Sequence, residues 1–280
     1  MRPLLEAGAQ VLSRAGVEGA RLDVELLLAA AAGVARVELL SGMDALGESV
    51  RARFAQSLAR RAGREPLAYI LGRKEFYSFE LEVGPGVLIP RPETELLVEV
   101  SLEEARRRRH PAVLDLGTGS GAIALAIAVG VPAVRVVATD VSADALGVAR
   151  RNIQGLKMGE RVEIRHADCF AVLDGGEPLG CFDLIVSNPP YIRDGEIDGL
   201  QAEVSRYEPR IALAGGADGL KFYRALACGA KRHLAAGGKL VVEVGAGQAA
   251  EVAAIFRSAN LLEIIIRNDL SGIPRVICAS

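Results

Sequence analysis

Residues 111–280 alternate short β-rich runs with helical or loop segments, and this alternation constrains the fold more than any other feature. Five runs come first: AVLDLG, VRVVATD, RVEIRHAD, FDLIVSN and GGKLVVEVG. Such alternation predicts a parallel sheet with helices on both faces. The last two runs, LLEIIIRND and IPRVICAS, are separated only by LSG. This gap is too short for a helical crossover, so these two strands must be antiparallel.

Five parallel strands followed by an antiparallel pair are typical of the class I S-adenosylmethionine (SAM) methyltransferase sheet, an α/β, Rossmann-like, seven-stranded sheet with an antiparallel last strand. We therefore predict a methyltransferase domain over residues 91–280. Residues 1–75 show helical periodicity only, which predicts a small all-α domain. Residues 76–90 are expected to form a β-hairpin linker, in which the strand EFYSFELEV, starting at Glu75, turns at GPG and pairs with VLIP. The following stretch, RPETELLVEVSLEEARRRR, is expected to be a helix with its arginines in the last turn.

Charge and composition narrow the classes of function. The net charge of −2 and the pI of about 6.0 give no basic field for nucleic acid. The four cysteines are scattered without a C-x-x-C pair and there are three histidines, so no metal site is expected. The apolar run 122–134 contains Gly130 and Pro132 and is too short to cross a bilayer. No signal peptide is recognisable, and we expect a cytoplasmic protein with no membrane partner.

Candidate cofactor-binding residues follow the first three strands. The loop DLGTGSGA contains Gly117, Gly119 and Gly121. Its glycines allow a tight turn and a close approach to a ligand, but the spacing also fits a dinucleotide site. Asp140 ends the second strand, where it could accept both ribose hydroxyls of an adenosyl group or could cap a helix. Asp168 ends the third strand and could accept an adenine amino group, with Cys169 and Phe170 near the base. The other two candidates in the glycine loop are Thr118 and Ser120.

The fourth strand is followed by Asn-Pro-Pro-Tyr, from Asn188 to Tyr191. The two prolines stiffen the loop and remove two N–H donors, so that carbonyls and the Asn188 side chain remain as acceptors. Such a loop suits a planar –NH2 group. The Asn188 oxygen and the Pro189 carbonyl would accept its two hydrogens, and Tyr191 would form a flat wall against it. Pro190 completes the predicted substrate-binding set.

The chain resembles the HemK/PrmC protein-(glutamine-N5) methyltransferases, which modify peptide chain release factors. The resemblance spans nearly the whole sequence and rests on five segments: REPLAYILGRKEFYSFELEV, GVLIPRPETELLVE, VLDLGTGSGAIALA, FDLIVSNPPYI and YEPRIALAGGADGLKFYR. It implies transfer of a methyl group from SAM, leaving S-adenosylhomocysteine, to the glutamine amide nitrogen in the Gly-Gly-Gln loop of class I release factors. Such methylation modulates translation termination.

The resemblance also implies roles for individual residues. The loop 117–121, Asp140 and Asn188 would contact the cofactor, and residues 188–191 would hold the glutamine. RPETE, residues 91–95, would lie over the cofactor, and the N-terminal helices would dock the release factor. Some relatives carry a tryptophan against the adenine where this chain has Cys169, so the stacking residue is open, with Phe170 as a candidate.

Two other functions fit part of the sequence. A methyltransferase for adenine or cytosine amino groups could also use Asn-Pro-Pro-Tyr, but it would have to bind phosphates and flip out a base. The nearly balanced charge of residues 1–80 argues against this function and against direct contact with nucleic acid. An NAD-dependent oxidoreductase would explain the glycine loop and Asp140, but it would leave the 188–191 loop and the antiparallel ending unexplained.

Overall fold

The computed structural model describes residues 1–41, 46–168 and 181–280. Its contacts divide the chain into two compact units. Unit one comprises residues 1–73 together with 200–207, and unit two comprises residues 74–199 and 208–280. A short segment from the second half of the sequence therefore belongs to the N-terminal unit. Each unit is described by itself below.

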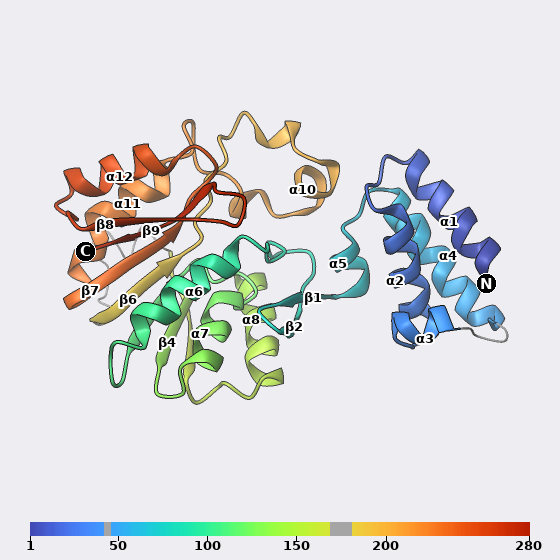
Figure 1. Ribbon diagram of the computed structural model, residues 1–280, viewed down its shortest axis with the longest axis horizontal. Helices are drawn as coiled ribbons and strands as arrows, with labels where there is room; N and C mark the ends of the chain where they lie inside the picture. The colour runs from blue at the N-terminus through green and yellow to red at the C-terminus, as the bar shows by residue number, and fades with distance from the viewer. Residues whose placement is uncertain (42–45, 169–180) are drawn as a thin grey trace. The chain divides into compact units, whose positions relative to one another are not determined.

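Unit one is helical, as the sequence predicts (Figure 1). Val24, Leu28 and Phe54 are buried in its core. Gly8 lets the helices approach closely, since a Cβ atom there would lie 3.0 Å from Val24 and 3.3 Å from Phe54. The helices are α1 (Arg2–Arg14), α2 (Ala20–Ala32), α3 (Arg36–Ser41), α4 (Glu48–Ala62), α5 (Leu67–Leu71) and α10 (Ala202–Tyr207).

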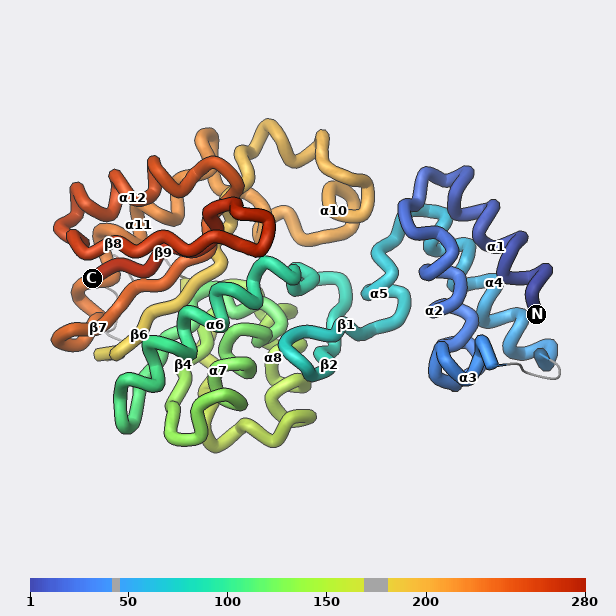
Figure 2. The backbone as a smooth tube through the Cα atoms, in the orientation of Figure 1, coloured from blue at the N-terminus to red at the C-terminus, as the bar shows by residue number. Residues whose placement is uncertain are grey.

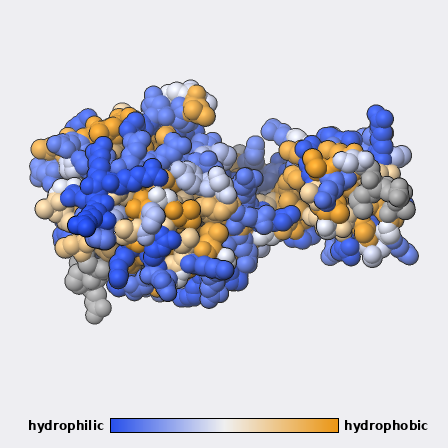
Figure 3. Space-filling model, turned by 60° about the horizontal axis from the view of Figure 1, so that its bottom comes forward, coloured by the Kyte–Doolittle hydropathy of each residue, from blue (hydrophilic) through white to orange (hydrophobic). Residues whose placement is uncertain are grey.

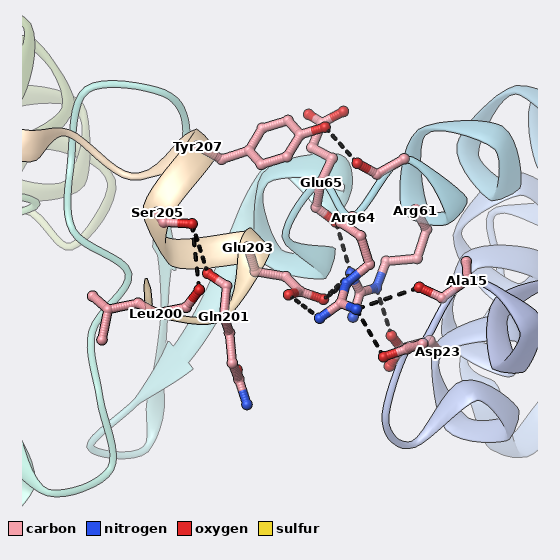
Figure 4. Close-up of polar contacts among 12 residues, drawn as sticks. Ala15, Asp23, Arg61, Arg64, Glu65, Leu200, Gln201, Glu203, Ser205 and Tyr207 are labelled. Atoms are coloured by element: carbon pink, nitrogen blue, oxygen red, sulfur yellow. Dashed lines mark hydrogen bonds and ion pairs between the residues drawn. The ribbon is translucent and has the colours of Figure 1, made fainter. Parts of the chain in front are cut away.

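Helix α10 is fixed within unit one by Glu203 (Figure 4). Its carboxylate accepts hydrogen bonds from Arg64 at 2.7 and 2.6 Å and from Arg61 at 2.8 Å. Arg61 also donates to Asp23 at 2.7 Å. Burial opposes ionisation of Glu203, but the bonds from Arg64 and Arg61 outweigh it and lower its pKa to about 2. In addition, the Tyr207 hydroxyl donates to a backbone carbonyl of the 62–65 turn.

Unit two contains the predicted seven-stranded sheet, with strand order β5-β4-β3-β6-β7-β9-β8. Pairing is parallel from β5 through β7, and β9 is antiparallel to both β7 and β8. The predicted class of sheet is confirmed, including the antiparallel last strand. The strands are β3 (Ala112–Leu116), β4 (Arg135–Asp140), β5 (Val162–His166), β6 (Phe182–Ser187), β7 (Leu234–Glu243), β8 (Ile264–Asn268) and β9 (Pro274–Ala279).

Helices cover both faces of this sheet (Figures 1 and 2). Neighbouring residues of a strand point to opposite faces, so Val113 packs with the α6 and α7 side while Leu114 packs with the α11 and α12 side. The helices are α6 (Thr94–Ala105), α7 (Ala122–Gly130), α8 (Ala143–Gly155), α11 (Lys221–Gly229) and α12 (Ala249–Ser258). Short 3-10 turns lie at Ile197–Gly199, Arg210–Ala212 and Ala230–Arg232.

The surface of unit two is mixed, with hydrophilic side chains spread between smaller hydrophobic areas on the face shown in Figure 3. No helix in the described part of the chain has both the length and the hydrophobicity to cross a membrane.

Two details of the predicted secondary structure are wrong. The run that begins at Glu75 is two strands, β1 (Arg73–Phe76) and β2 (Phe79–Glu82), and VLIP is not a strand. The hairpin turns at Tyr77 and Ser78, with φ of 47° and 70°. Such turns usually carry Asn-Gly or Asp-Gly, so Tyr-Ser gave no turn signal. The second detail is helix α6, which ends at Ala105, so the arginines follow the helix instead of forming its last turn.

Candidate functional site

A pocket of about 430 Å³ opens at the carboxyl ends of β3, β4 and β6 in unit two. This is the edge where open α/β sheets bind ligands. Among the predicted site residues, those that line it are Gly117, Gly119, Asp140, Asp168, Asn188 and Pro190. The topology thus brings together the ends of strands that are far apart in the sequence.

The glycine loop after β3 turns through three residues with positive φ, Gly117 at 75°, Gly119 at 57° and Gly121 at 83°. A Cβ atom on Gly117 or Gly119 would meet no protein atom within 4 Å, so the backbone of both faces open space. Gly121 instead packs against Ala149, which a Cβ atom would approach to 3.4 Å. The loop therefore exposes bare backbone to the pocket at its first two glycines.

The other predicted residues of the loop do not line the pocket. Thr118 is buried and donates its hydroxyl hydrogen to Asp115 at 2.6 Å. Ser120 is also buried, and its carbonyl accepts a hydrogen bond from Asn152 at 2.9 Å. These contacts hold the shape of the loop from within.

Asp115, which lies in strand β3 just before the glycine loop, was not predicted as a functional residue. Its Oδ2 accepts hydrogen bonds from Thr118 and from the Ala124 amide, at 2.6 and 3.2 Å. Its Oδ1 is buried and has no hydrogen-bond partner among the residues that the structure describes. Burial raises the pKa of Asp115 to about 7 despite those two bonds. A carboxylate inside the apolar run AVLDL was the available signal.

Asp140 ends β4 beside the glycine loop. Its two oxygens accept hydrogen bonds from the amides of Gly119 and Ser142, each at 2.9 Å. Ser142 is the N-cap of α8, since its hydroxyl accepts from the Ala145 amide. An ionised carboxylate has about four lone-pair sites, so Asp140 keeps acceptors for a ligand. Asp168 is exposed where it lines the same pocket. The predictions for Cys169 and Phe170 lie outside the described residues.

The loop from Asn188 to Tyr191 leaves β6 at the same edge. Asn188 lines the pocket, and its Nδ2 donates to the hydroxyl of Thr94 at 3.2 Å. Pro189 is buried, whereas Pro190 lines the pocket. Tyr191 is not part of the lining, and its hydroxyl lies 3.5 Å from Glu243. Burial and, secondarily, the charge of Glu243 raise the pKa of Tyr191 to about 12, so it stays neutral.

Thr94 and Glu243 support this loop and were missed from the sequence. Thr94 is in the first turn of α6 and donates its hydroxyl hydrogen to Glu243 at 2.7 Å. Glu243 ends β7 and is almost completely buried. Burial raises the pKa of Glu243 to about 7, against the bond from Thr94. A glutamate within the apolar run KLVVEV was again the signal.

Two further walls of the pocket were also missed. One precedes α6 and is formed by Gly86, Val87 and Leu88. The other comes from residues 209–222, where Pro209, Ile211, Ala212, Ala214, Lys221 and Phe222 line the pocket.

The segment RPETE was expected over the cofactor, but none of its residues lines the pocket. Arg91 instead forms an ion pair with buried Glu208. Glu208 also accepts from the Ile89 amide at 3.2 Å, and burial is the main cause of its raised pKa. These contacts fix the chain just after the 86–88 wall.

The chemistry of this lining suits S-adenosylmethionine. Bare backbone at Gly117 and Gly119 gives room for a closely bound ligand. Asp140 offers charged acceptors suited to a ribose diol, while Val87, Leu88 and Ala145 add apolar surface for an adenine ring.

Two family models match this chain. The PrmC N-terminal domain model matches residues 3–72, and the methyltransferase small domain model matches residues 92–204. A release factor glutamine methyltransferase of Geobacter sulfurreducens is 44% identical over 99% of this chain and 95% of its own length. One from Caulobacter vibrioides is 42% identical over 95% of this chain and 91% of its own.

Among solved structures, a methyltransferase from Pyrococcus furiosus has a TM-score of 0.53 at 20% identity, covering 80% of this chain and 98% of its own. This likeness concerns the fold alone. The sequence identity to the two bacterial relatives extends over nearly the full length of the chain and therefore shows the family as well as the fold. The chain belongs to the family of release factor glutamine methyltransferases.

Proposed function

We propose that the protein transfers a methyl group from SAM to the side-chain amide nitrogen of the glutamine in the Gly-Gly-Gln loop of class I release factors. The observation that carries this proposal is the position of Asn188, which lines the same pocket as Gly117, Gly119 and Asp140. A donor of methyl groups and a planar amide can therefore meet at one edge of the sheet. The names of the bacterial relatives supply the identity of the amide.

SAM, when bound, supplies a methyl group made electrophilic by a sulfonium. Gly117 and Gly119 would present backbone to the cofactor, and Asp140 would accept its ribose hydroxyls. Asp168 would accept the adenine amino group. Thr118, Ser120 and Gly121 act on the cofactor through the conformation of the loop, since they do not line the pocket.

The chemical task of the loop 188–191 is to make a poor nucleophile attack. The nitrogen lone pair of an amide is delocalised, on the scale of the ~18 to 20 kcal/mol barrier to amide rotation. Asn188 Oδ1 and the Pro189 carbonyl would accept the two hydrogens of the glutamine –NH2 and hold its nitrogen toward the methyl group. Preorganised acceptors then stabilise the positive charge that develops on nitrogen. The proton leaves to these acceptors or to water.

Pro190 would contact the substrate from the pocket wall, and Tyr191 would hold the loop from behind. The hydroxyl of Tyr191 points to Glu243. The backbone carbonyl of Tyr191 accepts a hydrogen bond from the Gln248 side chain at 3.0 Å. We therefore propose two roles for Tyr191, which are to support the loop and to form a wall against the substrate amide. The helical unit one is proposed to dock the release factor.

The test is incubation of the purified protein with methyl-labelled SAM and, in parallel, a class I release factor, its Gly-Gly-Gln variant with Gln→Ala, and DNA. We expect label on the unaltered release factor only. Label on DNA, or label on the release factor that survives the Gln→Ala change, would overturn the proposal.

A further inference from the structure

Thr94 lies between Asn188 and the buried carboxylate of Glu243. The Thr94 hydroxyl donates to Glu243 Oε2 at 2.7 Å and accepts from Asn188 Nδ2 at 3.2 Å. Thr94 and Glu243 are 4% and 1% exposed. Water is therefore largely excluded from the bond between Thr94 and Glu243, and each of the two side chains bonds to protein groups.

The direction of these bonds determines which side of the Asn188 carboxamide faces the pocket. A hydroxyl has a single hydrogen, and an ionised carboxylate can only accept. Above the pKa of Glu243, Thr94 must therefore give its hydrogen to Glu243. The Thr94 oxygen then remains as an acceptor, and only the –NH2 side of Asn188 can bond to it. The carbonyl side, Oδ1, is turned away from Thr94. An amide held by no such neighbour could present either side.

The Glu243 carboxylate is linked to both ends of the loop 188–191, directly to Tyr191 and through Thr94 to Asn188. Glu243 Oε1 lies 3.5 Å from the Tyr191 hydroxyl, while Oε2 is bonded to Thr94. The Glu243 backbone is held as well, because its carbonyl accepts from the Tyr223 hydroxyl at 2.9 Å. Glu243 is therefore held in place by its backbone, and its side chain supports the loop 188–191.

We infer that Thr94 and Glu243 are positioning residues that orient the Asn188 carboxamide, so that its oxygen and not its –NH2 meets the substrate amide. This inference rests on the proposed function. A wrongly oriented Asn188 would point N–H groups at a substrate that also brings N–H groups, which would abolish acceptance and leave cofactor binding intact.

The test compares Thr94→Val, which keeps the shape but removes the hydroxyl, with Thr94→Ser, which keeps the hydroxyl. Ser101→Ala is the matched control, because Ser101 is a buried hydroxyl of the same helix that bonds to the Leu97 carbonyl away from the pocket. We measure kcat on a release factor, the Kd for SAM and the melting temperature, at a pH above the pKa of Glu243.

Thr94→Val is expected to lower kcat by about 10- to 100-fold, the scale on which misplaced catalytic groups cost rate. Its Kd for SAM should stay within about twofold of the unaltered protein, and Thr94→Ser should recover most of kcat. The inference is overturned if Thr94→Val keeps kcat, if Thr94→Ser loses as much, or if Ser101→Ala loses as much.

A readout without turnover separates this inference from the proposed function. The side-chain –NH2 signals of Asn188, identified in ¹⁵N-resolved NMR spectra by their loss in Asn188→Ala, should move in Thr94→Val and stay close to their place in Thr94→Ser. The unaltered protein could methylate no release factor while the signals still move in Thr94→Val and stay in place in Thr94→Ser. In that case the proposed function fails and the inferred orientation of Asn188 stands. Unmoved signals in Thr94→Val would overturn the orientation itself.

Discussion

The backbone of Gly215 packs directly against the backbone of Tyr191. A Cβ atom on Gly215 would lie 2.8 Å from the Tyr191 Cα and 2.9 Å from the Pro190 oxygen. The two segments are also hydrogen-bonded, since the Gly215 amide donates to the Ile192 carbonyl at 2.8 Å and the Ile192 amide donates to the Leu213 carbonyl at 3.0 Å. The loop that carries Asn188 is thereby fixed to the pocket wall formed by residues 209–222.

Gly215→Ala should therefore disturb the site although residue 215 carries no reactive group. The new methyl group would meet backbone atoms, which cannot turn aside, so the loop 188–191 must shift. We expect a destabilisation of about 1 to 3 kcal/mol and a loss in kcat of ten-fold or more, since a shift of about 1 Å can cost up to about 10² in rate. Gly195→Ala is the control, because its Cβ atom would meet nothing within 4 Å. Equal kcat in the two variants would contradict the close packing.

Asp140→Ala should weaken SAM binding. Loss of charged acceptors costs about 1.5 to 3 kcal/mol for each hydrogen bond, so the Kd measured by calorimetry should rise by at least about tenfold. Asp144→Ala, which removes an exposed carboxylate from the first turn of α8 outside the pocket, is the control. If both variants bind SAM as the unaltered protein does, Asp140 acts only through its bonds to Gly119 and Ser142.

Asn188→Ala should separate binding from turnover. Because the carboxamide accepts the substrate hydrogens, its loss should reduce kcat by about 10² to 10³, as for other preorganised groups. The Kd for SAM should change much less. Equal losses in both quantities, measured by calorimetry and by methyl transfer on the same preparation, would mean that Asn188 serves cofactor binding alone.

Glu203→Ala should destabilise unit one. It removes the carboxylate to which both Arg64 and Arg61 donate and leaves Arg61 with Asp23 and the Glu65 carbonyl, at a cost of about 1 to 3 kcal/mol. Faster amide hydrogen exchange in α2 and α4 would locate the effect. Because the pKa of Glu203 is lowered to about 2, its contribution should be complete above its ordinary pKa of 4.5 and be lost as the pH falls toward 2. Glu196→Ala, in an exposed pair with Arg193 at 3.6 Å, should change little.

The raised pKa of Glu243 predicts an acid limb in the pH dependence of kcat. Below about 7 the carboxyl group is protonated and can donate to Thr94, which competes with Asn188 for the Thr94 oxygen. Arg275, Glu93 and Tyr191 also act on this pKa, with Arg275 opposing the rise and Glu93 favouring it. We therefore expect kcat to fall as the pH drops through about 7.

The control for this limb is Glu243→Gln, which cannot titrate and should show a flat profile in the same range. The free energy of unfolding should change with pH in the opposite sense to kcat. The folded protein keeps the proton of Glu243 where the unfolded chain has lost it, so stability should decrease as the pH rises from 4.5 to about 7. An unchanged acid limb in Glu243→Gln would assign that limb to another group.

The sheet could be predicted from the sequence because its strands are short β-rich runs that alternate with helical or loop segments. The antiparallel ending followed from the three residues LSG alone, since no helix fits in them. The hairpin was misplaced because Tyr77 and Ser78 adopt positive φ without being glycine or asparagine. Local sequence carries no sign of such a turn when the surrounding packing imposes it.

The candidate site was predictable where its residues follow strands, as for Gly117, Asp140 and Asn188. It was not predictable where contacts join distant segments. Nothing near Thr94 in the sequence indicates that its hydroxyl meets Glu243 and Asn188. Asp115 and Glu243 were visible only as carboxylates in apolar strands, and their raised pKa values depend on burial, which requires the fold.

The central claim is that Asn188 and its loop present acceptors to the amide of a release-factor glutamine. It is tested most directly by mass spectrometry of peptides from a class I release factor after incubation with SAM and either the unaltered protein or Asn188→Ala. We predict a single added methyl group on the side-chain amide nitrogen of the Gly-Gly-Gln glutamine, formed at least about 10²-fold more slowly by Asn188→Ala. A methyl group on any other residue, or equal rates for the two proteins, would contradict the claim.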